Sequence, residues 1–217
     1  RYDAMNRLLT AGLDQRWRRA ALDAVGVGRR DRVLDLACGT GDFAELAAAR
    51  GAQVIGVDFA REMLRGAGRR RIPALWIHGD AASLPLSDGS TTVVTCGFAL
   101  RNFASLKDVL SEMARVLASG GRLALLEVDR PSLAVVRTAH SLYFDRIVPR
   151  LGGWLSDRAA YTYLPRSTVY LPPAPELASL IADAGFRQLQ HRPLLLGSAQ
   201  IITAVRAERN NRNDQKA

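Results

Sequence analysis

The sequence VLDLACGTGDFAEL, residues 33–46, joins an apolar run of strand character to a tight glycine loop and the start of a helix. Gly39 and Gly41 carry no side chain, so the backbone can turn sharply there and approach a ligand closely. Asp35 stands directly before the loop. A strand, a glycine loop and a helix in this order indicate a nucleotide-binding loop.

Strand and helix segments alternate around this loop. We expect strands at 32–37, 52–58, 73–80, 91–99 and 122–128, and helices at 42–50, 60–71, 106–117 and 175–185. Strands separated by helices imply a parallel sheet. The last two strands, 186–196 and 199–206, are joined only by Gly197 and Ser198, which forces antiparallel pairing. The prediction is an α/β, Rossmann-like fold with a seven-stranded, mostly parallel sheet, helices on both faces and an antiparallel C-terminal hairpin.

The length of 217 residues fits one domain that carries an insertion. We predict this domain over residues 1–207, with a helical cap at 1–30 and a disordered tail at 208–217. The apolar, tyrosine-rich segment 130–172 is bounded by prolines and interrupts the alternation after the fifth strand. We therefore predict a helical insertion there, on the substrate side of the sheet.

The charge and the cysteine content indicate where the protein is located and which partners it binds. The net charge is +9, but the arginines are scattered and have no interleaved aromatic residues, so nucleic acid is not an expected partner. Cys38 and Cys96 are the only cysteines, which favours a reducing cytoplasm; we expect small buried thiols that line the pocket. Peripheral attachment to the anionic inner face of a membrane and a homodimer both stay open. No metal site is predicted.

The glycine loop fits two classes of ligand, and the first is a nicotinamide dinucleotide. Gly39, Gly41 and Ala44 satisfy the G-x-G-x-x-G/A fingerprint of nicotinamide-dependent dehydrogenases. A carboxylate at Asp35, however, would repel a pyrophosphate, whereas it can hold an ammonium group.

Two further carboxylates favour a different cofactor. Asp58 ends the second strand, where it can accept both hydroxyl groups of a ribose, and Asp80 follows the third strand, where it can accept from the amino group of adenine. Amino acid, ribose and adenine in this order make S-adenosylmethionine, so the pattern predicts a class I methyltransferase. Two alternatives stay open: Asp58 could cap the helix that begins near Ala60, and Asp80 could cap its own loop. His78 is expected to be structural.

Four segments outside the loop carry distinctive motifs. They are YDAMNRLLTAGLDQRWRR (2–19), FALRNF (98–103), LEVDRP (126–131) and PRLGGWLSDRAAYTYL (149–164). With them, the chain resembles the ubiquinone/menaquinone biosynthesis C-methyltransferase family, of the demethylmenaquinone methyltransferase type, over nearly its whole length.

The resemblance implies a set of functional residues. Those implied to bind S-adenosylmethionine are Thr40, Asp58, Asp80, Ala81 and Gly97, with the segment around Tyr2 folding over the cofactor. Arg101 and Asn102 correspond to the pair implicated near the quinone ring. The chain departs from the family pattern at Gly97, where serine is usual, and in the substrate half at Ala99, at Arg166 and at LPPA (171–174).

The resemblance implies C-methylation of the ring of a demethylated polyprenyl quinol. Arg101 is expected to stabilise the phenolate and Asn102 to orient the ring, with His140 and His191 as candidate bases. The first alternative is a small-molecule methyltransferase that acts on carbon, oxygen or nitrogen of a secondary metabolite. A non-catalytic cofactor-binding module or an RNA-associated protein is the second.

Overall fold

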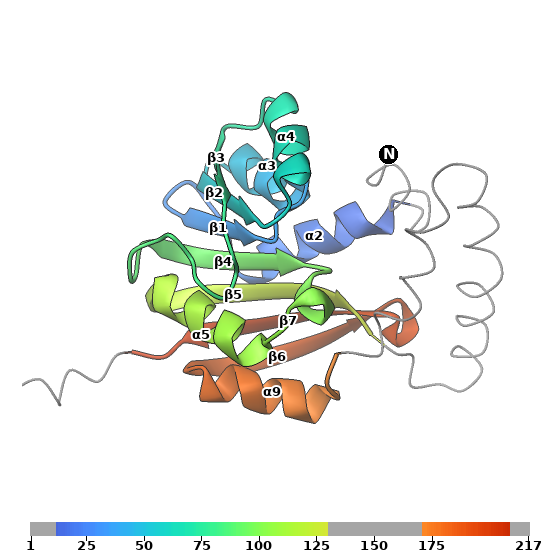
Figure 1. Cartoon of the computed structure of the whole chain (residues 1–217). Helices are drawn as coiled ribbons and strands as arrows, with labels where there is room; N and C mark the ends of the chain where they lie inside the picture. Colours follow the sequence, from blue (N-terminus) through green and yellow to red (C-terminus); the bar gives the residue numbers. More distant parts are fainter. Residues whose placement is uncertain (1–11, 130–170, 209–217) are drawn as a thin grey trace, which may run out of the picture.

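A computed structural model describes residues 12–129 and 171–208 (Figure 1). Tyr2, His140, Arg166 and most of the predicted insertion lie outside these residues, as does the predicted tail after residue 208. Among the described helices, none is long and apolar enough to cross a membrane.

The sheet has seven strands in the order β3-β2-β1-β4-β5-β7-β6 (Figure 1). Their bounds are β1 Arg32–Leu36, β2 Gln53–Asp58, β3 Ala74–His78, β4 Thr91–Gly97, β5 Leu117–Val128, β6 Phe186–Leu194 and β7 Ala199–Arg206. Strands β1 to β5 pair in parallel, and β7 runs antiparallel to both β5 and β6. The predicted fold class is therefore confirmed.

Two hydrophobic clusters lie on opposite faces of the sheet and hold the described helices, with one exception. The helices are α2 Leu13–Ala24, α3 Asp42–Ala49, α4 Arg61–Arg69, α5 Leu106–Val116 and α9 Ala174–Asp183. The exception is α4, which contributes a residue to neither cluster. Val33 of β1 packs with α2 and α3, whereas the next residue, Leu34, packs with α5 and α9. Successive side chains of a strand point to opposite faces, so an uninterrupted apolar strand is buried on both sides.

Two details differ from the sequence prediction. Strand β5 begins at Leu117, which pairs with Thr91 ahead of a register shift. Residues 118–121, which separate the predicted helix 106–117 from the predicted strand 122–128, therefore lie inside the strand. The C-terminal strands are not joined by two residues alone. Strand β6 ends at Leu194, and a 3-10 turn over Leu195–Gly197 precedes β7. The antiparallel pairing holds, but the predicted connection was too short.

The strand order places the site. From β1 the chain crosses outward to β2 and β3, and it later returns to pair β4 on the other side of β1. In open α/β sheets, ligands bind at the carboxyl ends of the strands where this direction reverses. The loop of residues 37–41, which follows β1, lies at that point.

Candidate active site

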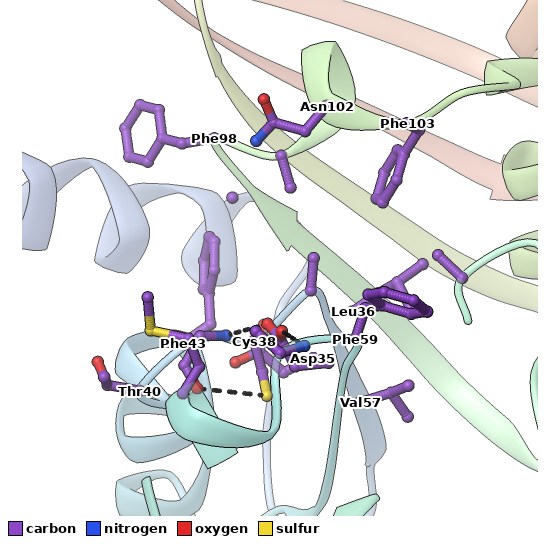
Figure 2. Close-up of a pocket in the computed structure, with 18 of the residues that line it drawn as sticks. Asp35, Leu36, Cys38, Thr40, Phe43, Val57, Phe59, Phe98, Asn102 and Phe103 are labelled. Atoms are coloured by element: carbon purple, nitrogen blue, oxygen red, sulfur yellow. Dashed lines mark hydrogen bonds between the residues drawn. The ribbon is translucent and has the colours of Figure 1, made fainter. Parts of the chain in front are cut away.

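A cavity of about 500 Å³ opens at the carboxyl ends of β1, β2 and β4 (Figure 2). This volume is in the range of roughly 300–1,000 Å³ that is typical of small-molecule sites. Nine of the residues that the sequence predicted for the site line this cavity: Asp35, Cys38, Gly39, Thr40, Asp58, Asp80, Ala81, Gly97 and Asn102. Cys96, by contrast, is fully buried in the core and does not line the cavity, so its predicted place was wrong.

Three carboxylates follow one another along the edge of the sheet. Asp80 comes after β3, Asp58 ends β2, and Asp35 lies in β1. Since the strands adjoin in the order β3-β2-β1, these side chains line the cavity in the sequence 80, 58, 35. The order matches the predicted adenine, ribose and amino-acid positions.

The two glycines of the loop have different roles. Gly39 has φ +57°, lines the cavity, and would place a Cβ in open space. Gly41 has φ +88°, and a Cβ there would lie 2.5 Å from Cη2 of Trp76. Gly41 is not a lining residue. Gly39 thus leaves room for a ligand, whereas Gly41 lets the loop pack on Trp76, which corrects the expectation that both serve close ligand approach.

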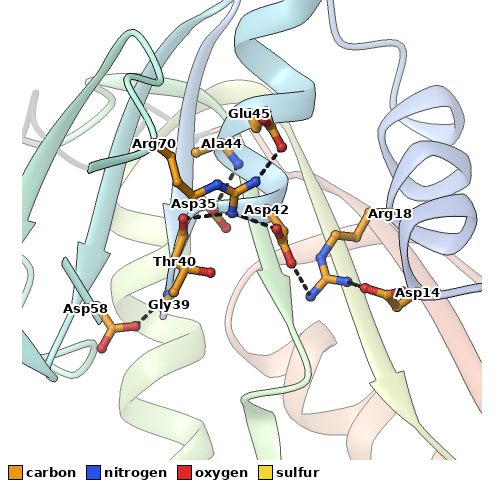
Figure 3. Close-up of polar contacts among 10 residues, drawn as sticks. All are labelled: Asp14, Arg18, Asp35, Gly39, Thr40, Asp42, Ala44, Glu45, Asp58 and Arg70. Atoms are coloured by element: carbon orange, nitrogen blue, oxygen red, sulfur yellow. Dashed lines mark hydrogen bonds and ion pairs between the residues drawn. The ribbon is translucent and has the colours of Figure 1, made fainter. Parts of the chain in front are cut away.

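Arg70, the C-cap residue of α4, hydrogen-bonds the loop between β1 and α3 (Figure 3). Its Nη1 donates to the carbonyl oxygen of Thr40 at 2.9 Å and to Asp42 at 2.7 Å, and its Nη2 donates to Glu45 at 2.5 Å. These bonds hold the turn between β1 and α3 in one conformation. A preformed loop costs less ordering entropy when a ligand binds.

Asp35 is buried and supports the start of α3. Its Oδ2 accepts from the backbone N–H of Ala44 at 3.0 Å, and its Oδ1 accepts from Thr95 Oγ1 at 3.3 Å. Burial raises the pKa of Asp35 to about 7, although the Ala44 bond and the charge of Arg18 oppose the shift. A cation at this carboxylate would favour its ionised form.

Asp58 and Asp80 both brace loops and line the cavity. Asp58 accepts from Gly39 N–H and from Ala60 N–H, each at 2.7 Å. Asp80 accepts from Ala82 N–H at 2.9 Å. A carboxylate has about four lone-pair sites, so each side chain keeps capacity for a ligand. These bonds leave room for the predicted ligand contacts of Asp58 and Asp80, which stay a prediction; Asp58 bonds the backbone of Ala60, the N-cap residue of α4, without itself being the cap.

Gly97 makes room for an aromatic side chain. A Cβ at this position would lie 2.8 Å from Cε2 of Phe43. The next residue, Phe98, has φ +59° and also lines the cavity. Non-glycine residues rarely adopt this conformation, and such strain gathers at functional sites. At this position the family usually has serine, and in this chain any side chain would displace the Phe43 ring.

Arg101 does not line the cavity as expected, whereas Asn102 does (Figure 2). Both belong to the 3-10 turn η1, Leu100–Asn102, after β4. The Arg101 guanidinium forms a buried ion pair with Glu127 of β5. The structure therefore turns Arg101 toward the protein rather than toward a substrate.

Sequence reasoning missed Glu127, Arg18 and Phe59. Glu127 was detectable as a carboxylate inside the apolar strand sequence LALLEV, where a buried charge needs a partner. Phe59 follows Asp58, is 73% exposed, and lies with its ring centroid 5.9 Å from that of His78 at the cavity rim. His78 is not a lining residue. His191 lies exposed on the edge strand β6 and does not line the cavity either.

Solved structures share this fold. A putative methyltransferase from Bacillus halodurans aligns with a TM-score of 0.64 at 18% identity, covering 87% of this chain and 98% of its own. A Haemonchus contortus phosphoethanolamine N-methyltransferase aligns with a TM-score of 0.66 at 15% identity, covering 89% of this chain and 53% of its own.

The strand order, with its antiparallel end and the cavity at its switch point, is that of the class I methyltransferase fold. The chain belongs to the ubiE/COQ5 methyltransferase family, whose model matches residues 1–206. It is 42% identical to a demethylmenaquinone methyltransferase of Thermus thermophilus, over 93% of this chain and 94% of that one. It is 38% identical to a ubiquinone/menaquinone biosynthesis C-methyltransferase of Syntrophotalea carbinolica, over 95% and 90% respectively.

Proposed function

We propose that this chain transfers a methyl group from S-adenosylmethionine to a ring carbon of a demethylated polyprenyl quinol. The observation that carries the proposal is the order of carboxylates along the cavity, Asp80, Asp58 and Asp35, beneath the open side of Gly39. The names of the 42% and 38% identical relatives support the acceptor.

The charge of the cavity suits this cofactor. Acidic lining residues outnumber basic ones within the described chain: they are Asp35, Asp42, Asp58 and Asp80, against Arg18. Such a site attracts a sulfonium cation and repels a pyrophosphate. When bound, S-adenosylmethionine supplies a strongly electrophilic methyl group to an aligned nucleophile.

Different cavity residues bind different parts of the cofactor. Asp58 accepts from the ribose hydroxyls, and Asp80 with Ala81 holds the adenine amino end. Gly39 and Thr40 border the methionine part, while Asp35 faces its ammonium group. Phe59 covers the nucleoside from the rim. The closure of the segment around Tyr2 over the cofactor remains a prediction.

The acceptor ring enters from the side of the segment that follows β4. Phe98, Asn102 and Phe103 all line the cavity on this segment (Figure 2). The aromatic side chains exclude water from the reacting atoms, and the Asn102 amide hydrogen-bonds a ring hydroxyl so that the ring carbon faces the methyl group. Because Arg101 is held by Glu127, it acts by positioning Asn102 rather than by touching the phenolate.

A methyl-transfer assay tests the proposal. Purified protein is incubated with S-adenosylmethionine and a chemically reduced demethylmenaquinone, and the lipid is analysed by mass spectrometry. The expected product is heavier by one methylene and appears with an equal amount of S-adenosylhomocysteine. Methylation of small water-soluble phenols with an unchanged quinol would instead favour the secondary-metabolite alternative, and no methylation of either would favour a binding module.

A further inference from the structure

Arg18 brings a positive charge into the cavity from α2 (Figure 3). Its guanidinium carbon lies 5.5 Å from the ring centroid of Phe43 and 5.2 Å from that of Phe98. Cation–π contacts of this kind favour one orientation of the guanidinium plane. The side chain is 11% exposed, so solvent screens its charge only weakly.

The hydrogen-bonding capacity of Arg18 is not used up. Nη1 donates to Asp14 at 2.9 Å, but Nη2 lies 3.9 Å from Asp42, which is beyond hydrogen-bond distance. Asp42 itself accepts from Arg70 at 2.7 Å. The Nε atom of Arg18 is buried and has no hydrogen-bond partner among the residues that the structure describes. With Nη2 beyond hydrogen-bond distance of Asp42, the guanidinium keeps donor capacity for an acceptor in the cavity that Arg18 lines.

The position of Arg18 identifies the acceptor. Phe98, which its guanidinium contacts, follows β4, and β4 adjoins β1 on the side away from β2 and β3. Arg18 therefore lies at the end of the cavity opposite Asp80, close enough to Asp35 to lower the pKa of that carboxyl. Under the proposed function, this end holds the methionine part of the cofactor.

We propose that Arg18 binds the carboxylate of the methionine moiety of the adenosyl cofactor. This inference rests on the proposed use of S-adenosylmethionine. The amino-acid end of that cofactor is a zwitterion, and the cavity offers a carboxylate, Asp35, for the ammonium group and one guanidinium, Arg18, for the carboxylate. The two aromatic contacts hold the guanidinium in place, so little of its side-chain entropy is lost on binding.

The test compares ligands that differ at this carboxylate. Calorimetric titrations use S-adenosylhomocysteine, its decarboxylated analogue, which keeps the amine, and 5′-methylthioadenosine, which lacks the amino-acid part. In Arg18→Gln, affinity for S-adenosylhomocysteine should fall about 10- to 100-fold, because hydrogen bonds to charged groups contribute about 1.5–3 kcal/mol. Affinity for the two other ligands should change less than about twofold.

Two further variants keep the result interpretable. Arg16→Gln removes an exposed arginine of the same helix and should leave all three affinities unchanged. Arg18→Lys keeps the charge and loses the planar fork, so it should give an intermediate loss confined to S-adenosylhomocysteine; it also serves if Arg18→Gln does not fold.

The outcomes separate the inference from the proposed function. An equal loss for all three ligands, or no loss for S-adenosylhomocysteine, overturns the role of Arg18 while adenosyl binding by the unaltered protein stands. Failure of the unaltered protein to bind any of the three overturns both.

Discussion

Glu127 and Arg101 form a buried ion pair that ties the end of β5 to the turn η1 after β4. The Glu127 carboxylate also accepts from the backbone N–H groups of Leu100 and Val128, each at 2.9 Å. Burial raises the pKa of Glu127, and the charge of Arg101 opposes that rise. One carboxylate thus fixes the conformation of the turn whose last residue, Asn102, lines the cavity.

Replacement of Glu127 should affect the fold and turnover more than cofactor binding. Glu127→Gln removes the carboxylate that pairs with the buried Arg101 guanidinium, and breaking a buried pair costs about 3–5 kcal/mol. The free energy of unfolding from urea titration should fall accordingly, and kcat should fall at least about tenfold as Asn102 loses its position. Strongly reduced affinity for S-adenosylhomocysteine with unchanged stability would contradict this positioning role. Glu112→Gln, which breaks the part-buried pair with Arg115 away from the cavity, is the matched control.

Asn102 offers a test of the acceptor side alone. Its side chain is exposed to the cavity, and therefore Asn102→Ala should leave the thermal unfolding midpoint and the affinity for S-adenosylhomocysteine nearly unchanged. The kcat for the quinol should fall about 10- to 100-fold, the loss expected for a positioning hydrogen bond. Lys107→Ala, at an exposed position of the next helix, should change none of these values. Full activity in Asn102→Ala would exclude the orienting role.

Asp35 should make cofactor binding depend on pH. Its pKa of about 7 lies in the range of the measurement, and Arg18 and Asp42 are the charged neighbours that act on it. A bound ammonium group favours the ionised carboxylate, so binding releases a proton and affinity for S-adenosylhomocysteine should rise from about pH 6 to about pH 8. Titration in buffers of different ionisation enthalpy detects that proton. Asp35→Asn should remove both effects, and an unchanged pH profile in this variant would refute the assignment.

The same group predicts the pH dependence of stability without ligand. The folded pKa of about 7 lies above the ordinary value of 3.8, so between these values the unfolded chain ionises Asp35 while the folded chain keeps it protonated. The unfolded state therefore binds fewer protons, and this group lowers the free energy of unfolding as pH rises through that window. The difference in unfolding free energy between Asp35→Asn and the unaltered protein, measured by urea titration across the window, isolates this contribution.

The two loop glycines should respond differently to alanine. Gly39→Ala places a methyl group in the open space of the cavity at φ +57°, so it should cost about 1–2 kcal/mol of stability and most of the cofactor affinity. Gly41→Ala also drives a Cβ into Trp76 and should lower the thermal midpoint further. Gly41→Ala combined with Trp76→Phe should recover part of that loss. Equal stability of the two single variants would contradict the separation of roles.

Gly97→Ser restores the residue usual in the family and should harm this chain. Its Cβ would stand 2.8 Å from Phe43, and overpacking of this kind costs about 1–3 kcal/mol. Phe43 also supports the guanidinium of Arg18, so affinity for S-adenosylhomocysteine should fall too. The added change Phe43→Leu should restore the thermal midpoint. A Gly97→Ser variant as stable as the unaltered protein would show that the ring moves aside freely.

The sheet and the cofactor side of the cavity were predictable because they depend on local patterns. The apolar strand and glycine loop at 33–46 predict the connection from β1 to α3. The positions of Asp58 and Asp80 at the ends of their strands can be read from the sequence. Strand ends at the switch point must share one edge of the sheet. The predicted carboxylates therefore reached the cavity.

The acceptor side depends on contacts between residues far apart in sequence. Arg101 turned inward because Glu127, from the neighbouring strand, lies beside it. Gly41 is constrained by Trp76 of β3. Arg18 of α2 lies against Phe43 of α3 and Phe98 after β4. The left-handed conformation of Phe98 follows from this packing and has no signal in the local sequence. Periodicity and motifs carry no information about these pairs.

Parallel calorimetric titrations with S-adenosylhomocysteine and with a nicotinamide dinucleotide test the cofactor assignment most directly. The acidic cavity beneath Gly39 predicts saturable binding of S-adenosylhomocysteine at one site per chain and no heat from the dinucleotide. Binding of the dinucleotide without any binding of S-adenosylhomocysteine would contradict the account.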